Sequence, residues 1–348
     1  MKEPPPAFSA ADVDYHCPPD LIAQHPAVPR GADRMLVLDR ATGARTHAQF
    51  EAFPDLINPG DALVVNTSKV IAARLHGARD NGRPAEILLV HPEPDGTWLA
   101  MVHPGGKLRA GRLVRLGADT TAEIVGVVGG GLRRVRFTGP LDAAGIMRAH
   151  GAVPLPPYIH RAPDATDGER YQTVYAKVDG SVAAPTAGLH FTPAILDRIR
   201  ARDVALVELV LHVGPGTFKP VEVDDPARHA MHAEWYDVPV ASAETLNRVK
   251  GHGGKIWAVG TTAARTLETV TTPDGMIHPG TGWADLFIYP PYRFRAVDHL
   301  LTNFHLPRST LLMLVAAFAG RDAIMGAYAE AVAHAYRLYS YGDAMAVI

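Results

Sequence analysis

Two glycine-bearing loops in the middle of the chain each combine a histidine with a threonine. The first reads APTAGLHF from residue 184, and the second reads LHVGPGTF from residue 211. Imidazole titrates near neutral pH and a threonine hydroxyl donates and accepts hydrogen bonds, so either loop could supply an acid/base group and a substrate contact. The alternative for each histidine is a structural hydrogen-bonding role. The candidates in these loops are Thr186, Gly188, His190, His212 and Thr217.

A third segment, HAMHAE at residues 229–234, brings two imidazoles and a carboxylate close together. Its spacing is not that of a zincin motif, and the single cysteine, Cys17, is far away in the sequence. We therefore expect no metal site. His232 and Glu234 instead predict an acid/base or substrate-orienting pair, because a carboxylate can orient an imidazole.

A fourth segment, GTT at residues 260–262, lies where a predicted strand is followed by a helix. Exposed amide hydrogens at a helix start favour an anion, and the threonine hydroxyls add donors. Thr262 and Arg265 are therefore candidates for holding a substrate carboxylate or phosphate, the alternative being a capped helix start. The chain has no Walker loop and no dinucleotide-binding glycine fingerprint, which disfavours nucleotide hydrolysis and nicotinamide chemistry.

Two segments near the C-terminus also place polar side chains beside turn residues. NFHLP at residues 303–307 precedes a helix that should begin near Ser309, so Asn303 and His305 should be held rigidly. YSYGD at residues 339–343 is a glycine turn with aromatic residues, and Asp343 ends it. We expect Asn303, His305 and Asp343 to contact substrate. A docking tail is the alternative for the last segment.

The elements around these segments predict an α/β fold. Thr192 should cap a helix that Pro193 opens, and an apolar run of strand length, residues 204–211, follows it. Strands and helices then alternate, and in such sheets ligands bind at the carboxyl ends of strands. The remaining predicted elements are strands at 35–38, 255–259 and 286–289 and helices at 241–250, 309–319 and 322–337.

From residue 61 the pattern changes to short strands, most of them separated by glycine turns, which is typical of a small barrel or sandwich. The strand-like runs are 62–65, 70–73, 86–90, 97–102, 113–116, 122–125 and 132–137. A stiff proline-rich connector, residues 153–158, follows. We therefore predict an antiparallel β-barrel domain, residues 60–152, inserted into a discontinuous α/β domain made of residues 1–59 and 153–348. Residues 1–19 should form an extended or loosely held arm.

Charge and composition narrow the possible partners and compartments. The chain has 348 residues, 47% of them hydrophobic and 20% charged, which indicates a globular protein. Its net charge is −2, yet residues 69–136 carry eleven basic and six acidic side chains, or +5, which leaves −7 elsewhere. Such asymmetry favours a phosphate-backbone partner, with a solvated face as the alternative. One cysteine, no secretory signal and no run long enough to span a bilayer predict a cytoplasmic protein that does not bind membranes.

Six segments, in order, resemble the S-adenosylmethionine:tRNA ribosyltransferase-isomerase family of queuosine biosynthesis. Together they are far more specific than any one of them, and the resemblance runs from about residue 20 to the C-terminus. The segments are APTAGLHF, LHVGPGTFKPV, HAMHAE, AVGTT from residue 258, TNFHLPRSTLLMLVAAFAG from residue 302 and YSYGDAM from residue 339. The resemblance implies an α/β domain interrupted by a β-barrel, as predicted above.

The resemblance also implies the reaction. Family members use S-adenosylmethionine as a ribosyl donor and 7-aminomethyl-7-deazaguanine at the wobble position of tRNA as acceptor, and the products are epoxyqueuosine, adenine and methionine. No prosthetic group is implied. The sulfonium acidifies the neighbouring ribose methylene, so a base near neutral pKa can start the reaction. The candidate bases are His190, His212, His232 and Glu234, and no motif ranks them; Thr217, Thr262 and Arg265 should hold the donor.

The basic β domain and the α/β cleft should share the contact with the anticodon stem-loop of the tRNA partner, because splayed loop bases are recognised while basic side chains hold the backbone. The candidate RNA contacts are Lys69, Arg74, Arg133, Arg134 and Arg136. We expect a monomer. Two other functions stay open: a tRNA-binding protein that has lost turnover, and an enzyme that moves the ribosyl group to a different acceptor.

The chain departs from the family pattern in two places. Residues 66–74 read NTSKVIAAR where members often have NDTRVIPAR, and residues 261–265 read TTAAR where members have TTSVR. Lysine cannot make the bidentate contact that arginine makes with a carboxylate or phosphate. These departures leave the fold prediction unchanged, but they could change the catalytic efficiency or the identity of the acceptor.

Overall fold

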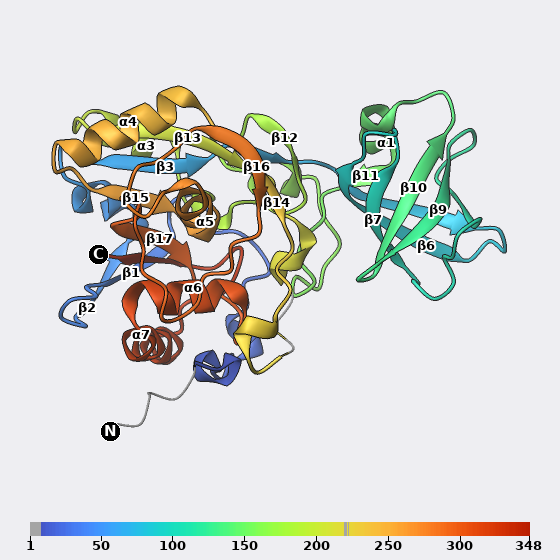
Figure 1. Ribbon diagram of the computed structural model, residues 1–348. Helices are drawn as coiled ribbons and strands as arrows, with labels where there is room; N and C mark the ends of the chain where they lie inside the picture. The colour runs from blue at the N-terminus through green and yellow to red at the C-terminus, as the bar shows by residue number, and fades with distance from the viewer. Residues whose placement is uncertain (1–7, 219–220, 222) are drawn as a thin grey trace, which may run out of the picture.

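The computed structural model describes residues 8–218, 221 and 223–348. Its two main bodies are a large mixed β-sheet flanked by helices and a smaller β-barrel to one side (Figure 1). The large sheet has nine strands, drawn from both ends of the chain. In spatial order these are β16 (Gly280–Ala284), β14 (Glu234–Val238), β13 (Ala205–Leu211), β3 (Ala62–Asn66), β15 (Ile256–Val259), β17 (His299–Asn303), β18 (Ala344–Val347), β1 (Arg34–Leu38) and β2 (Arg45–Gln49).

The centre of the sheet is parallel and its edges are antiparallel. β13, β3, β15 and β17 pair in parallel, whereas β14 and β16 fold back along one edge and β2 along the other. Every residue of β3 and β15 is buried, as expected for strands covered on both faces. The sheet thus has a continuous apolar centre, with its more polar strands at the margins.

Helices cover both faces of this sheet. α3 (Pro193–Arg200) lies on one face, and α4 (Val240–Gly251), α5 (Gly260–Val270), α6 (Thr310–Ala319) and α7 (Arg321–Ala333) contribute to the core on the other. The predicted caps are confirmed: the hydroxyl of Thr192 accepts from the Ile195 amide, and that of Ser309 accepts from the Leu312 amide. Gly320, at φ 89°, ends α6 and precedes α7.

The barrel is a closed ring of six antiparallel strands. In ring order these are β5 (Arg74–Arg79), β6 (Pro84–Pro92), β7 (Trp98–His103), β10 (Leu132–Thr138), β9 (Thr121–Gly129) and β8 (Leu113–Arg115), and β8 pairs with β5 to close it. Alternate side chains fill the interior, and Ile146 of α1 (Ala143–His150) joins that cluster. The short strand β11 (Gly151–Ala152) pairs with the outside of β5.

The remaining elements are short and either connect the two bodies or pack beside the large sheet. Among the described residues, β4 (Ser68–Val70) pairs with β12 (Val178–Ser181) beside the passage into the barrel, and α2 (Asp167–Arg170) follows the proline-rich connector. The 3-10 helices are η1 (Ala10–Val13), η2 (Pro19–Leu21), η3 (Phe50–Leu56), η4 (Thr186–Gly188), η5 (Pro215–Phe218) and η6 (Pro226–Arg228).

The predicted α/β fold with an antiparallel β-barrel is confirmed, and three local predictions are wrong. The run 62–65, assigned to the inserted domain 60–152, is β3 of the large sheet, because an unbroken apolar run suits a strand buried on both faces. Residues 286–289 are not a strand; the chain pairs just before them, as β16. Within the predicted arm, Ala10 and Val13 are fully buried in the core; its first seven residues lie outside the described ones.

Among the described residues, no single helix is long and apolar enough to cross a bilayer. The pair α6 and α7, bent by 116°, meets that requirement only when the two are counted together.

Candidate functional site

A cavity of about 280 Å³ opens between the loop after β13, the start of β14 and the N-terminal half of α5. Its apolar side is formed by residues 286–288 and by α6. A second cavity of about 40 Å³ adjoins it, and the two share Thr217, Thr261, Thr262 and Leu311 in their walls. The polar lining of the larger cavity is Thr217, Arg228, His229, His232, Glu234, Thr261, Thr262, Arg265 and Thr310.

The N-terminus of α5 lies between the two cavities. β15 ends at Val259 and Gly260, at φ 86°, turns the chain directly into the helix. No side chain caps this helix, so its first amides are not satisfied by a local side-chain acceptor. Thr261 and Thr262 of this first turn line both cavities. The predicted anion-favouring helix start therefore faces a cavity.

Glu234 and Arg265 form an ion pair in the wall of the larger cavity. Both side chains are about nine-tenths buried. The second carboxylate oxygen of Glu234, Oε1, accepts a hydrogen bond of 2.7 Å from the amide of Gly214. Burial lowers the pKa of Arg265 to about 10, which still leaves it charged at neutral pH. The pair is therefore a fixed charge arrangement at the cavity wall.

His232 lines the same cavity and is exposed on its open side. Its ring lies against the backbone of Gly216: a Cβ added there would stand 2.7 Å from the ring Cδ2. Only glycine gives the ring this position, directly beside Thr217. His229, which the sequence analysis included in its motif without selecting it, also lines the cavity and contacts the ring of Phe287.

Besides the shared Thr217 and Thr262, the smaller cavity gathers three more of the predicted substrate contacts: Thr186, Asn303 and His305. Asn303 donates from its amide nitrogen to the Tyr339 carbonyl at 3.0 Å, while its buried Oδ1 has no hydrogen-bond partner among the described residues. His305 Nε2 lies 2.6 Å from the hydroxyl of Thr302, and burial lowers the pKa of this imidazole to about 3. His305 is therefore a neutral group, and the free acceptor of Asn303 is available for a ligand.

Two of the four candidate bases lie elsewhere. His190 is buried beneath the sheet, with Nδ1 2.9 Å from Asp33, and belongs to the lining of neither cavity. His212 stacks on Trp235 and shares a 2.7 Å hydrogen bond with the hydroxyl of Ser68. Burial lowers its pKa. The structure therefore brings only His232 and Glu234 of this group together.

Two of the predicted substrate contacts also lie outside the cavities. Gly188 packs against Tyr175, whose hydroxyl would be 2.1 Å from an added Cβ. Asp343 is buried and accepts hydrogen bonds from the amides of Arg34 and Arg337. Each residue has a local structural role. Gly188 allows Tyr175 to approach the backbone closely, and Asp343 links the C-terminal turn to β1.

Most of the predicted RNA contacts have partners within the protein. Lys69 lies 3.3 Å from Asp179, Arg74 lies 3.3 Å from Glu86 and Arg134 lies 3.2 Å from Glu93. Arg133 donates to three backbone carbonyls around residues 105–132. Arg136 is exposed on β10. These side chains lie on and beside the barrel, away from both cavities.

The sequence departures fall in packed or connecting positions. Ala263 and Ala264 are fully buried in the core under α5, and Lys69 is on the exposed passage into the barrel. Thr67 is buried directly after β3 and joins it to β13, since its amide and its hydroxyl donate to the Leu209 carbonyl at 2.8 and 3.2 Å. None of these side chains lines either cavity.

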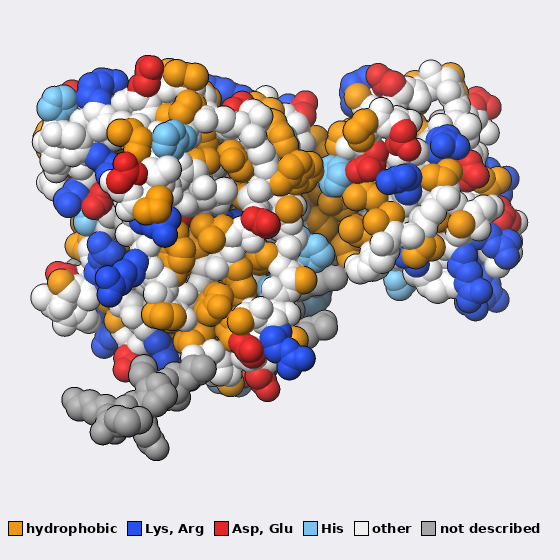
Figure 2. All heavy atoms as spheres, in the orientation of Figure 1, with side chains coloured by type: hydrophobic (Ala, Val, Ile, Leu, Met, Phe, Trp, Pro, Cys, Tyr) orange, Lys and Arg blue, Asp and Glu red, His pale blue; other side chains and the backbone are white. Residues whose placement is uncertain are grey.

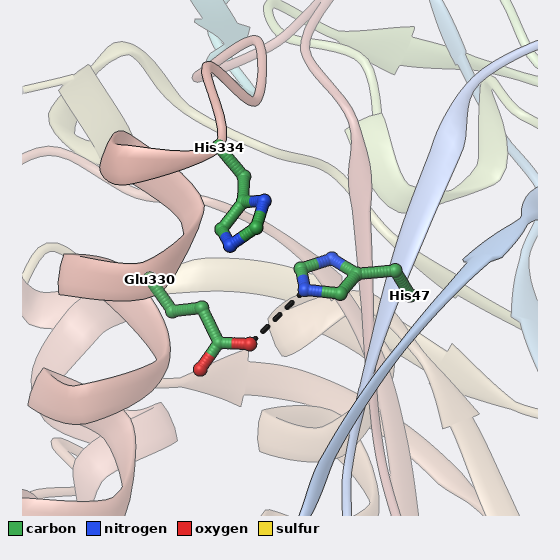
Figure 3. A group of neighbouring side chains, drawn as sticks. All are labelled: His47, Glu330 and His334. Carbon is green, nitrogen blue, oxygen red and sulfur yellow. Dashed lines mark ion pairs between the residues drawn. The ribbon is translucent and has the colours of Figure 1, made fainter.

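A separate group with metal-ligand chemistry lies at the opposite edge of the sheet (Figure 3). Among the described residues it is formed by His47 of β2 together with Glu330 and His334 at the end of α7. His47 Nε2 is 3.0 Å from Glu330, and its Nδ1 is 2.8 Å from the hydroxyl of Tyr336. Glu330 also pairs with Arg45, and the hydrogen bond and charge of Arg45 lower its carboxyl pKa. The existing contacts explain the group as an ion pair that fastens β2 to α7.

Four residues that line the cavities were not among the predicted site residues: Arg228, Thr310, Tyr158 and Ser340. Ser340 stands in the YSYGD segment and Thr310 beside the predicted cap, so position alone could have suggested them. Tyr158 comes from the connector and is hydrogen-bonded to Ser340 at 2.7 Å. No local pattern marks a residue that reaches the cavity from so far along the chain.

Comparison with known proteins gives one consistent result. A family model described as "Queuosine biosynthesis protein" matches residues 10–347. Two relatives named S-adenosylmethionine:tRNA ribosyltransferase-isomerase are similar over nearly their whole length: that of Moorella thermoacetica is 50% identical and covers 97% of this chain and 99% of its own, and that of Thermotoga maritima is 48% identical and covers 98% and 100%.

A solved structure has the same overall fold. The crystal structure of S-adenosylmethionine tRNA ribosyltransferase from Thermotoga maritima aligns with a TM-score of 0.55 and 38% identity, over 97% of this chain and all of that one.

Proposed function

Because this chain belongs to the queuosine biosynthesis protein family, we propose that it transfers and isomerises the ribosyl group of S-adenosylmethionine onto 7-aminomethyl-7-deazaguanine at the wobble position of tRNA. The products are epoxyqueuosine-tRNA, adenine and methionine. The structural observation that carries this proposal is the cavity of about 280 Å³ in which a helix start, an ion pair and imidazoles meet. Its size suits a nucleoside-sized ligand.

The start of α5 holds the donor in this proposal. Thr261 and Thr262 line the cavity at this helix start, and such a helix start binds a carboxylate such as that of the methionine portion. Arg265 adds positive charge there, although Glu234 already engages it. Thr217, shared by both cavities, contacts the same ligand. The carboxylate of Glu234 also lies where it can attract the sulfonium.

His232 is our choice for the base. It is the candidate imidazole that lines the cavity, and its ring is fixed against Gly216. A neutral imidazole can remove the proton from the ribose methylene that the sulfonium acidifies. Loss of adenine and attack by the aminomethyl group follow. Glu234 is the second choice, because its two oxygens are engaged by Arg265 and by the Gly214 amide.

The smaller cavity recognises a base edge in this scheme. The free Oδ1 of Asn303 accepts from an exocyclic amine or ring N–H, and His305 stays neutral beside it. A buried acceptor without a partner discriminates strongly for a ligand that supplies the missing donor. Thr186 of η4 also lines this cavity and can contribute its hydroxyl.

The partner is the anticodon stem-loop of tRNA, with the barrel as a second contact surface. We place the barrel as an inserted domain that begins after β4 and ends with β11, since its ring of strands has an interior of its own. The protein acts as a monomer in the cytoplasm, where tRNA and S-adenosylmethionine are both present.

The test measures, by chromatography, the adenine released from S-adenosylmethionine in the presence of tRNA that carries the deazaguanine. Release that depends on this tRNA supports the proposal. Binding of that tRNA with no release would indicate a non-catalytic tRNA-binding protein. Release that requires another acceptor would indicate ribosyl transfer to a different substrate. A tRNA with guanine at the wobble position is the matched control, because it lacks only the aminomethyl nucleophile and the deaza ring.

A further inference from the structure

A third cavity, of about 170 Å³, lies in the barrel and is lined by three cations. Arg79 is the last residue of β5, and Lys107 and Arg112 come from the segment between β7 and β8. The only acid in its lining is Asp80, and Leu108, fully buried, forms part of the apolar floor. The local charge is therefore about +2, concentrated on one recess.

These cations are only weakly paired with acidic groups. Arg112 reaches Asp80 only at 3.7 Å, and both side chains are more than half exposed. The buried Nε of Arg79 has no hydrogen-bond partner among the described residues, and the same holds for the Nε of Arg74 and Arg134. In contrast, Arg74 and Arg134 have carboxylate partners at 3.2–3.3 Å, and Arg133 is bonded to three carbonyls. The recess thus gathers three of the barrel's cations in one place, while Arg136, exposed on β10, is a further available charge.

We propose that Arg79, Lys107 and Arg112 bind a backbone phosphate of the tRNA. The inference rests on the proposed function and deepens it, because it names the part of the barrel that touches the RNA. Guanidinium and ammonium groups around a recess match a phosphate in charge and in hydrogen-bond donors. The exposed rim is mostly polar, with Asp80, Asn81, Lys107 and Arg112 and a single apolar side chain, Leu113. A protein or membrane partner would need a more apolar rim.

The position of the recess determines which phosphate it takes. β5 starts at Arg74, which donates to the Leu155 carbonyl beside the connector to the large sheet, and ends at Arg79. Five residue steps of an extended strand carry Arg79 about 17 Å farther from that connector. In Figure 2, Lys and Arg side chains gather at the end of the barrel away from the large sheet. The phosphate therefore belongs to a nucleotide well separated from the one that enters the main cavity.

The experiment measures binding of fluorescently labelled tRNA between about 50 and 200 mM KCl. In the variant K107A/R112A, loss of one phosphate contact should reduce the slope of log K against log salt by about one, and weaken binding about eightfold at 0.1 M salt. Asp80→Asn should strengthen binding, because it removes the one competing carboxylate. The control is R198A/R200A on α3, which removes the same charge from exposed, ion-paired positions elsewhere.

Lys107 and Arg112 are exposed, so their replacement should leave the melting temperature unchanged. Arg79 lies in a partly buried strand, so the salt slope of Arg79→Gln is compared with that of the wild type only when the two proteins have the same melting curve. An unchanged salt slope in K107A/R112A, or an equal change in R198A/R200A, overturns the proposal. Turnover is measured separately: kcat at saturating tRNA should be retained in K107A/R112A while KM for tRNA rises. If wild-type protein binds tRNA but releases no adenine, the proposed reaction fails and the phosphate site is still tested by the slopes.

Discussion

Glu234 and Arg265 meet in the wall of the main cavity, although the first begins β14, an antiparallel strand next to the sheet edge, and the second lies in the helix after a central strand. Their pairing holds β14, the second strand from the edge, against α5. It also fixes one negative and one positive charge at the place where a zwitterionic ligand carrying a sulfonium would lie. The same contact therefore contributes to stability and to the electrostatics of the site.

Replacing Arg265 with Gln should destabilise the protein by about 3–5 kcal/mol, because it leaves the carboxylate of Glu234 buried without its counter-charge. Urea unfolding measures the loss. The double variant E234Q/R265Q should lose much less than the sum of the two single variants, since neither charge is then left unpaired. Additive losses would mean that the two side chains do not interact as the structure shows.

Replacing His232 with Ala should lower kcat for adenine release by about 10²–10⁴-fold if this imidazole is the base. The side chain is exposed, so the melting temperature should stay close to that of the wild type. His252→Ala, at the exposed end of α4, is the matched control and should have full activity. Normal turnover in His232→Ala would remove this residue from the mechanism and leave Glu234 as the candidate base.

Gly188→Ala should destabilise the fold by about 1–3 kcal/mol without a direct effect on ligand binding. The new methyl group would stand 2.1 Å from the Tyr175 hydroxyl and 2.7 Å from Thr173 Cγ2. Tyr175→Phe removes the first of these contacts, and the Tyr175 hydroxyl has no hydrogen-bond partner to lose among the described residues. The double variant should therefore recover part of the stability. A Gly188→Ala protein of normal stability that no longer binds S-adenosylmethionine would contradict this structural role.

Stability should fall on mild acidification, and His305 should account for part of the fall. Its pKa is about 3 in the folded protein because of burial, whereas an unfolded histidine titrates near 6.5. Below about pH 6.5 the unfolded chain binds a proton that the folded protein does not. This group therefore lowers the free energy of unfolding by about 2 kcal/mol at pH 5.

Urea unfolding of His305→Gln at several pH values tests this expectation. The variant should show a flatter dependence of stability on pH between about 7 and 5, whatever its absolute stability. His212, whose pKa burial also lowers, is a useful comparison: it is less enclosed, so His212→Gln should flatten the curve less. An unchanged slope in His305→Gln would show that this imidazole is accessible to protons in the folded protein.

Local patterns in the sequence were sufficient for much of the fold. The caps at Thr192 and Ser309, the stop at Gly320 and the strand before the GTT turn are all present, because each depends on residues within one or two turns of the chain. The series of short strands also predicted the barrel. The run at 62–65 was assigned to the wrong domain because an apolar strand has the same sequence pattern in a barrel and in a buried sheet. Only its pairing with β13 and β15 shows that it belongs to the large sheet.

The sequence by itself determined the fold class, the barrel and the segments that carry polar groups, since periodicity, caps and turns are encoded locally. The tertiary structure alone decided which of those groups meet. His190 and His232 occur in similar polar, loop-forming stretches, yet one is buried against Asp33 beneath the sheet and the other faces the cavity. The physical reason is strand order: β14 folds back at the edge of the sheet beside β13, and that long-range pairing brings His232 and Glu234 to the start of α5.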